Sequence, residues 1–178
     1  MTWVRADSGG QVRREDTAPL LRITEFTDAA CPWAWGAEPA FRLLRQTLGP
    51  CAAWRRVFGI LFDEDDDPAP DPDAEARWYE RFIGDVTAHT GAPYAPRLHW
   101  LTRSSRPASL AAKASEAQGP EVAQRVVRRL RETTFVLGTP ADSEDGIREA
   151  VRGVPGLDVG RLLTDLGSSQ VRDAVRED

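Results

Sequence analysis

The pattern of apolar and polar positions predicts a short α/β unit near the start of the chain. Residues 20–26, LLRITEF, combine β-branched and aromatic side chains with partial alternation, as in a strand. A helix follows, because apolar residues recur at helical spacing behind Pro32, which suits a first helical position. The apolar face predicted for it consists of Trp33, Ala37, Ala40, Phe41 and Leu44. A second strand at 53–62 completes a β-α-β unit over 19–62, with parallel strands.

The rest of the chain, 74–178, is predicted to be a helical subdomain. The expected helices cover roughly 74–90, 105–118, 120–137, 142–152 and 158–176, the last divided near Gly167. In the third of these, one face is formed by Val122, Val126, Val127, Leu130 and Thr134. The arginines of this helix, Arg125, Arg128, Arg129 and Arg131, are expected to lie largely outside that face.

Two segments are predicted to lie outside the packed elements. Residues 1–18 are polar and have no apolar period, so we expect a flexible N-terminal arm. Residues 63–73, DEDDDPAPDPD, are a charge run interrupted by three prolines. They lack the glycine and the glutamate that a calcium-binding EF-hand loop needs at its sixth and twelfth positions, so they are interpreted as an acidic linker.

Composition and charge narrow the class of partner. A chain of 178 residues with a net charge of −5 fits one compact unit and disfavours nucleic acid or an anionic membrane surface as a partner. It has neither an apolar run long enough to span a bilayer nor an apolar leader segment, so a cytoplasmic location is expected. His89 and His99 are too few for a zinc site, and no nucleotide motif is present, so no metal or cofactor is predicted.

Cys31 is the candidate reactive residue. It falls between the end of the first strand and the first turn of the helix, where unpaired backbone N–H groups and the helix dipole stabilise a thiolate. Pro32, Trp33 and Trp35 are the candidate residues for binding a substrate or thiol, with the two indoles as apolar walls beside the sulfur. The alternative is that Cys31 is simply a small buried hydrophobic residue.

The polar residues expected near this turn each allow two interpretations, one functional and one structural. Glu25 and Asp28 could relay a proton to Cys31 or tune its charge, or they could form a solvated strand end. Ser105 and Arg106 precede a proline at a predicted helix start, where backbone donors could hold an anion. Capping of that helix by the serine explains the same residues more simply.

Cys51, the second cysteine, is not expected to pair with Cys31. About 15 helical residues separate the two, which places them roughly 20 Å apart at opposite ends of the crossover helix. A disulfide needs Cα atoms within about 7 Å of each other. We therefore interpret Cys51 as a structural residue and Cys31 as a lone thiol.

Three segments carry a resemblance to a known family. They are ITEFTDAACPWAWGAEPAFRLL, WRRVFGIL and SSRPASLAAKASEAQGPEVAQRVVRRLRE. Together they resemble the DsbA-like proteins of the thioredoxin fold, particularly their cytoplasmic bacterial branch with a CPWC site, from about residue 20 to the end. The resemblance implies a thioredoxin-like α/β fold interrupted by a helical subdomain, with Cys31 as the attacking cysteine. It also implies a protein disulfide, or a protein or small-molecule thiol, as the partner.

The sequence departs from this family in two ways. Ala34 stands where the resolving cysteine is expected, so a mixed disulfide on Cys31 has no internal thiol to release it. The family also has an X-Pro loop with a cis bond, followed by two strands and a helix. Thr139-Pro140 and Val154-Pro155 are the candidates for that loop, but no strand-like segment follows either. We therefore expect the C-terminal strands of the thioredoxin part to be missing, whether by truncation or because that part is incomplete.

Three functions remain open, and the sequence does not decide whether the protein is an enzyme. The first is a disulfide oxidoreductase or isomerase that acts through Cys31 alone, with an external thiol, such as a low-molecular-weight thiol, as cosubstrate. The second is a catalytically degenerate binding or adaptor protein that uses a Trp33/Trp35 surface. The third is a glutathione-dependent kappa-class transferase or isomerase, although those proteins usually carry serine where Cys31 stands.

Overall fold

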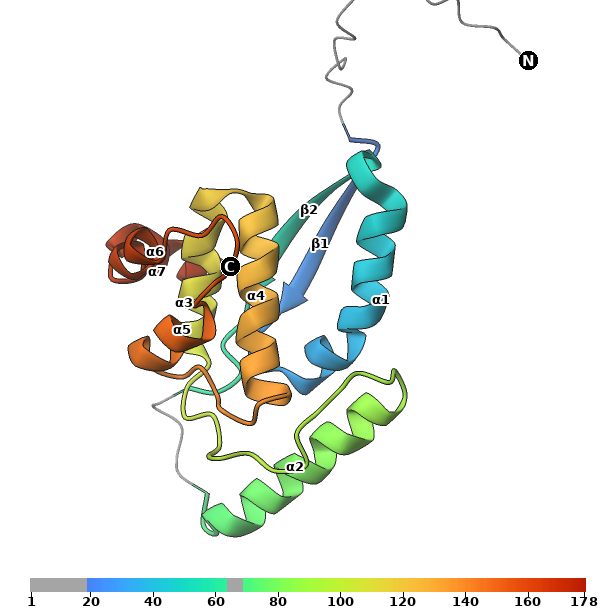
Figure 1. Ribbon diagram of the computed structural model, residues 1–178, viewed down its shortest axis with the longest axis vertical. Helices are drawn as coiled ribbons and strands as arrows, with labels where there is room; N and C mark the ends of the chain where they lie inside the picture. Colours follow the sequence, from blue (N-terminus) through green and yellow to red (C-terminus); the bar gives the residue numbers. More distant parts are fainter. Residues whose placement is uncertain (1–18, 64–68) are drawn as a thin grey trace, which may run out of the picture.

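The computed structural model describes residues 19–63 and 69–178 and shows two parallel strands with a larger helical part (Figure 1). The predicted N-terminal arm and the middle of the predicted acidic linker lie outside the described residues. The first unit comprises β1 (Leu21–Thr27), α1 (Pro32–Leu48), the short helix η1 (Gly49–Cys51) and β2 (Ala52–Phe58). The helical part comprises α2 (Pro72–Ala88), α3 (Arg106–Ser115), η2 (Glu116–Gln118), α4 (Pro120–Phe135), α5 (Glu144–Ala150), α6 (Val159–Leu166) and α7 (Ser169–Glu177).

β1 and β2 pair in parallel, as predicted, from Leu21 beside Ala52 to Thr27 beside Phe58. The crossover helix α1 ends at Gly49, whose φ of 47° is a backbone conformation that glycine adopts most readily. β2 is shorter than the predicted strand 53–62. After Phe58 the chain leaves the ladder, and the N–H groups of Leu61 and Phe62 donate to side chains rather than to a strand.

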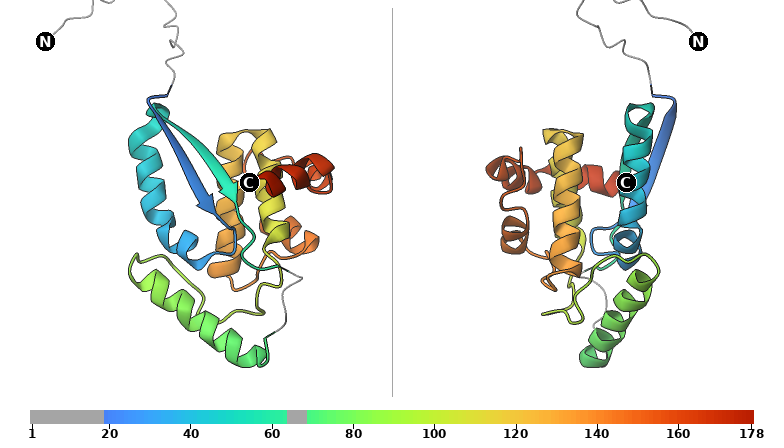
Figure 2. Two further views of the ribbon diagram at one scale, coloured as in Figure 1. Left: turned by 180° about the vertical axis from the view of Figure 1, so that it is seen from behind. Right: turned by 45° about the vertical axis from the view of Figure 1, so that its right-hand side comes forward.

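The helices cover one face of the small sheet. On that face, Glu25 of β1 meets Arg45 of α1, and Thr27 meets Arg131 of α4. The left view of Figure 2 shows the strands in front of the helices, from the side that the helices leave open. Phe26 points to that open side and is 79% exposed. The face of β1 that carries Phe26 is therefore left open by the described residues, although Val57, the partner of Phe26 on β2, is buried.

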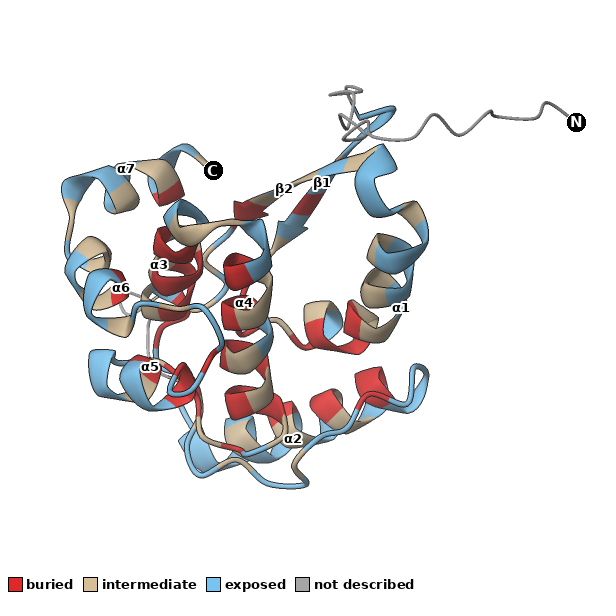
Figure 3. Cartoon of the chain, turned by 45° about the horizontal axis from the view of Figure 1, so that its top comes forward, coloured by how far each residue is buried: buried red, intermediate tan, exposed pale blue. Residues whose placement is uncertain are grey.

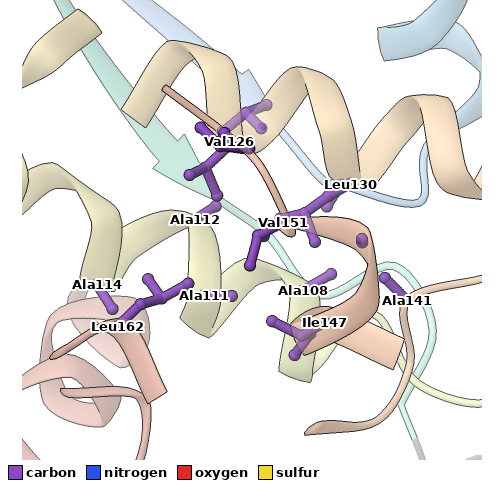
Figure 4. Packing of buried hydrophobic residues seen from close by; sticks show 14 of the residues in the cluster. Ala108, Ala111, Ala112, Ala114, Val126, Leu130, Ala141, Ile147, Val151 and Leu162 are labelled. Carbon is purple, nitrogen blue, oxygen red and sulfur yellow. The ribbon is translucent and has the colours of Figure 1, made fainter. Parts of the chain in front are cut away.

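The main apolar core lies among α3, α4, α5 and α6 (Figure 4). Ala108, Ala111 and Ala112 give α3 a face of small side chains, which lets the neighbouring helices approach closely. The predicted apolar face of α4 is confirmed, since all five of its members are buried; Figure 3 shows this burial along α3 and α4. The expected position of Arg131 was wrong, because its side chain is completely buried.

A second cluster of buried apolar residues lies between α1, α2 and α4. Trp35 stacks on Phe135 with ring centroids 6.0 Å apart, and Tyr79 and Ile83 of α2 complete the cluster. At Gly36, an added Cβ would meet a side-chain atom of α2 at 2.9 Å, so the small residue permits the close approach of the two helices. The start of α1 is thus fixed against α2.

The predicted apolar face of α1 was wrong. Trp33 is 61% exposed and Leu44 is 42% exposed, whereas Trp35 and Glu38 are buried. The reason is that α1 packs on α2 and α4 through a different side, which includes a carboxylate paired with a buried arginine. Apolar spacing alone did not reveal that side.

Among the described helices, none combines the length and the apolar character required to cross a lipid bilayer.

Candidate functional site

Cys31 lies immediately before α1, at the carboxyl end of β1. It is the N-cap residue of the helix, with φ −79° and ψ 119°, and its carbonyl accepts the first helical bond from Trp35 N at 3.1 Å. Its N–H donates to Asp28 O at 3.3 Å, and its thiol is free and partly exposed. Pro32 occupies the first helical position and is buried. The predicted strand-to-helix position of Cys31 is confirmed, beside the unpaired N–H groups of the first turn.

The carboxylate of Asp28 organises the turn that precedes Cys31. Its Oδ1 accepts the N–H of Ala30 at 2.6 Å, and its Oδ2 accepts the Ser105 hydroxyl at 2.6 Å and the N–H of Leu61 at 2.8 Å. The side chain is 5% exposed, so a solvated strand end is wrong for Asp28. Ser105 does not cap α3 as expected, because its hydroxyl is used by Asp28 instead. The carboxylate therefore ties the turn to α3.

Two aromatic side chains, from α2 and α1, donate hydrogen bonds to backbone carbonyls in and around the same turn. The Tyr79 hydroxyl donates to Ala30 O at 2.9 Å, and the Trp35 indole N–H donates to Pro93 O at 2.8 Å. Burial, and then the negative charges of Cys31 and Asp28, raise the pKa of Tyr79 well above its usual range. The phenol therefore stays protonated and keeps donating its hydrogen bond. Trp35 is 5% exposed, so it supports the site from the core and does not present a surface.

An exposed aromatic surface adjoins Cys31, and we call it the aromatic patch: Trp33, Phe82 and Trp78. The Trp78 ring stacks on Phe82 at 5.2 Å, and the Trp33 ring meets Phe82 edge-on at 6.0 Å. Trp33 and Trp78 are 61% and 54% exposed. Two indoles, from α1 and α2, thus contact one half-buried ring, and the first of them, Trp33, stands two residues after Cys31.

A buried charged cluster lies between β1, α1, β2 and α4. It consists of Glu25, Glu38, Arg45, Arg56 and Arg131, whose side chains are at most 14% exposed. Arg131 donates to Glu38 Oε2 at 2.7 Å and to Thr27 Oγ1 at 2.5 Å, just before the turn of Cys31. The cluster joins the helical subdomain to the strand and the helix that flank the thiol.

Glu25 is the carboxylate at the centre of that cluster. It accepts hydrogen bonds from Arg45 at 2.5 Å and from Arg56 at 3.1 Å, and Arg131 lies 3.5 Å away. Burial by itself would raise the pKa of Glu25, but the attraction of these three guanidinium groups outweighs it and holds the pKa below its usual value. Glu25 is therefore an ionised, buried partner of arginines, and a solvated strand end is wrong for it as well.

Cys51 lies at the far end of α1, as expected from the length of the helix, but it is exposed, which does not support the structural role expected for it. The 17 residues of α1 span about 25 Å. Cys31 has no second cysteine of this sequence within disulfide distance. In the described ranges, no group of three or more histidine, cysteine, aspartate or glutamate side chains is placed to hold a metal ion.

Sequence reasoning missed several of the residues that build the site. Tyr79 and Ser105 form hydrogen bonds with residues 49 and 77 positions away in the sequence, and no local sequence pattern predicts such contacts. A signal did exist for Arg131. It stands four residues after Val127 and three before Thr134, which places it along the buried face of α4.

A thiol at the start of the crossover helix, on a β-α-β unit joined to a helical subdomain, is an arrangement of the thioredoxin fold. The chain belongs to the thioredoxin family, since a family model described as thioredoxin matches residues 25–178. Cytosolic disulfide reductase DsbM from Pseudomonas aeruginosa shares the fold with a TM-score of 0.70 at 16% identity, over 88% of this chain and 75% of that one. The predicted family and fold class are confirmed.

Curated relatives of this chain carry the name of an adapter. The protein named "ClpXP adapter protein SpxH" from Shouchella clausii is 30% identical over 160 residues, which cover 89% of this chain and 52% of that protein. Its namesake from Halalkalibacterium halodurans is 28% identical over 186 residues, which cover 97% of this chain and 57% of that protein. This chain thus spans little more than half the length of these relatives.

Proposed function

We propose that this protein is a protein-binding adapter of the DsbA-like group and that its docking surface is the aromatic patch beside Cys31. The observation that carries the proposal is the exposure of Trp33 and Trp78 on either side of Phe82. Exposed apolar patches on soluble proteins are often interaction sites, and tryptophan is enriched among the residues that dominate binding energy. Here both indoles are pre-positioned, so little conformational entropy is lost on docking.

The thiol arrangement favours binding over a complete dithiol cycle. Ala34 stands where a resolving cysteine would be, and Cys51 lies at the other end of α1. The relatives named as ClpXP adapters favour the same function. We extend that role to this chain, with a protein as its partner. We place the protein in the cytoplasm as part of this proposal, where a free thiol such as Cys31 persists.

The adapter function is tested by binding to purified ClpXP from the same organism, measured with the full chain immobilised. We expect the Trp33→Ala, Trp78→Ala double variant to bind about tenfold or more weakly, because two indole contacts are removed. Trp100→Ala is the matched control, since Trp100 is 43% exposed and lies outside the patch. The proposal fails if the wild-type chain does not bind, or if the control weakens binding as much as the double variant.

A second candidate function is thiol exchange through Cys31 alone, and its partly exposed position at the start of α1 favours it. The Cys31 thiolate would attack a disulfide, form a mixed disulfide and release the other sulfur as a thiolate. An external thiol such as glutathione would then attack the mixed disulfide and regenerate Cys31. Incubation with oxidised glutathione, followed by mass spectrometry, should show one adduct on Cys31. The absence of an adduct, or equal modification of Cys51, would count against this function.

A further inference from the structure

The buried charged cluster contains an unequal number of opposite charges. Arg45, Arg56 and Arg131 contribute three guanidinium groups, whereas Glu25 and Glu38 contribute two carboxylates. A buried charge is costly unless an opposite charge or hydrogen bonds compensate it. One positive charge of this cluster is therefore left without a buried counter-ion among the described residues.

The unsatisfied donors of the cluster are on the arginines. Nε and Nη1 of Arg45 have no hydrogen-bond partner, and Nη1 comes no closer than 3.8 Å to a Glu38 oxygen. Arg56 uses Nε for Glu25 and Nη2 for Gln124, and the other buried donor of the cluster without a partner is Nε of Arg131. Two of the three buried donors that lack a partner in this cluster are therefore on Arg45.

Arg45 and Arg56 of this cluster line a cavity of about 630 Å³. The cavity lies between β2, the last turn of α1 and the first turns of α4, and Gln124 and Trp54 also line it. Arg45 sits over the Trp54 ring at 4.9 Å, so a cationic group and an aromatic wall are adjacent. The cavity is near the end of α1 opposite to Cys31, since Arg45 stands 14 residues after Cys31, about 20 Å along the helix. It is therefore separate from the thiol and from the aromatic patch.

We propose that this cavity is a binding site for a small carboxylate with an apolar body. The carboxylate matches the surplus of one positive charge, and it can accept paired hydrogen bonds from a guanidinium group. The apolar body would lie along Ala52, Ala53 and Trp54 of β2. Glu116 and Glu121 line the same cavity and repel any anion, but they repel a dianion such as phosphate more strongly than a singly charged carboxylate, so phosphate fits less well. This site is independent of the proposed adapter function.

The experiment uses the ¹⁵N-labelled full chain and phenylacetate at low ionic strength. Arginine Nε–H signals and the Trp54 indole signal report the site by NMR. We expect saturable shifts at Arg45, Arg56 and Trp54. Phenylacetamide, which has the same shape without the charge, should give none, and phosphate should bind more weakly than phenylacetate.

Variants then assign the binding to the two arginines. Arg45→Gln and Arg56→Gln should each weaken phenylacetate binding about tenfold or more, the loss typical of a charged hydrogen bond. Arg97→Gln is the matched control on an exposed arginine outside the cavity and should leave binding unchanged. If a variant fails to fold, the shift map of the wild-type chain decides the question. The absence of saturable shifts at these residues, equal binding of the amide, or stronger binding of phosphate would each overturn the proposal.

Discussion

Arg131 of α4 and Glu38 of α1 form an ion pair at 2.7 Å, with side chains that are 0% and 2% exposed. The pair is 93 residues apart in sequence and joins the helical subdomain to the helix that begins at Cys31. Because Arg131 also donates to Thr27, a single guanidinium holds both elements that flank the site. The position of the thiol relative to the helical subdomain therefore depends on a buried charge.

The first prediction concerns that ion pair. Glu38→Gln removes the nearer of the two carboxylates beside the buried Arg131 guanidinium and leaves only Glu25, at 3.5 Å, so we expect the free energy of unfolding to fall by about 3 kcal/mol. Glu149→Gln is the control, because its pair with Arg152 is exposed; its loss should stay within about 0.5 kcal/mol. Urea unfolding of both variants measures the difference. Equal losses would mean that the buried pair does not stabilise the fold.

The second prediction concerns pH. The folded-state pKa of Glu25 lies below its value in the unfolded chain, because three arginines outweigh the effect of burial. Glu25 therefore stabilises the fold fully above its unfolded pKa of about 4.3, and this contribution is lost as the pH falls through the folded-state pKa. We expect acidification from about pH 7 to about pH 3 to cost the wild-type chain more stability than Glu25→Gln. Parallel pH profiles of the two proteins would contradict this.

The third prediction concerns the support of the Cys31 turn. Tyr79→Phe removes the hydrogen bond to Ala30 O and leaves a buried carbonyl without its donor, so unfolding should become easier by about 1 kcal/mol. Local opening of the turn should also increase, which hydrogen exchange at Ala30 and Cys31 would detect. Tyr94→Phe, at a 45% exposed tyrosine, is the control and should change neither quantity. Unchanged exchange in Tyr79→Phe would show that the phenol does not hold the turn.

Local rules predicted the elements well and their contacts only in part. A helix at 120–137 was predicted because its apolar residues follow one face, and α4 covers Pro120–Phe135; Pro32 correctly marked the start of α1. The end of β2 was predicted too late, because residues after Phe58 are drawn toward Asp28 and Ser105. Those two partners become neighbours only after the chain has folded.

In the candidate site too, the local features were predicted from the sequence, whereas the contacts between distant elements were not. The position of Cys31 at the start of the helix followed from the turn and the proline alone. The exposure of Trp33 and the burial of Trp35 did not, because α2 and α4 decide which side of α1 is covered. The charged cluster was unpredictable for a similar reason. A buried arginine is stable only beside its carboxylates, and these come from two other elements.

The central claim is that the aromatic patch, and not the thiol, carries the function. The most direct test compares Cys31→Ser with Trp33→Ala in binding to purified ClpXP from the same organism. Our account predicts that Cys31→Ser keeps the wild-type affinity within about twofold, while Trp33→Ala lowers it about tenfold or more. The reverse result, with binding lost in Cys31→Ser and kept in Trp33→Ala, would contradict the account and favour exchange through the single thiol.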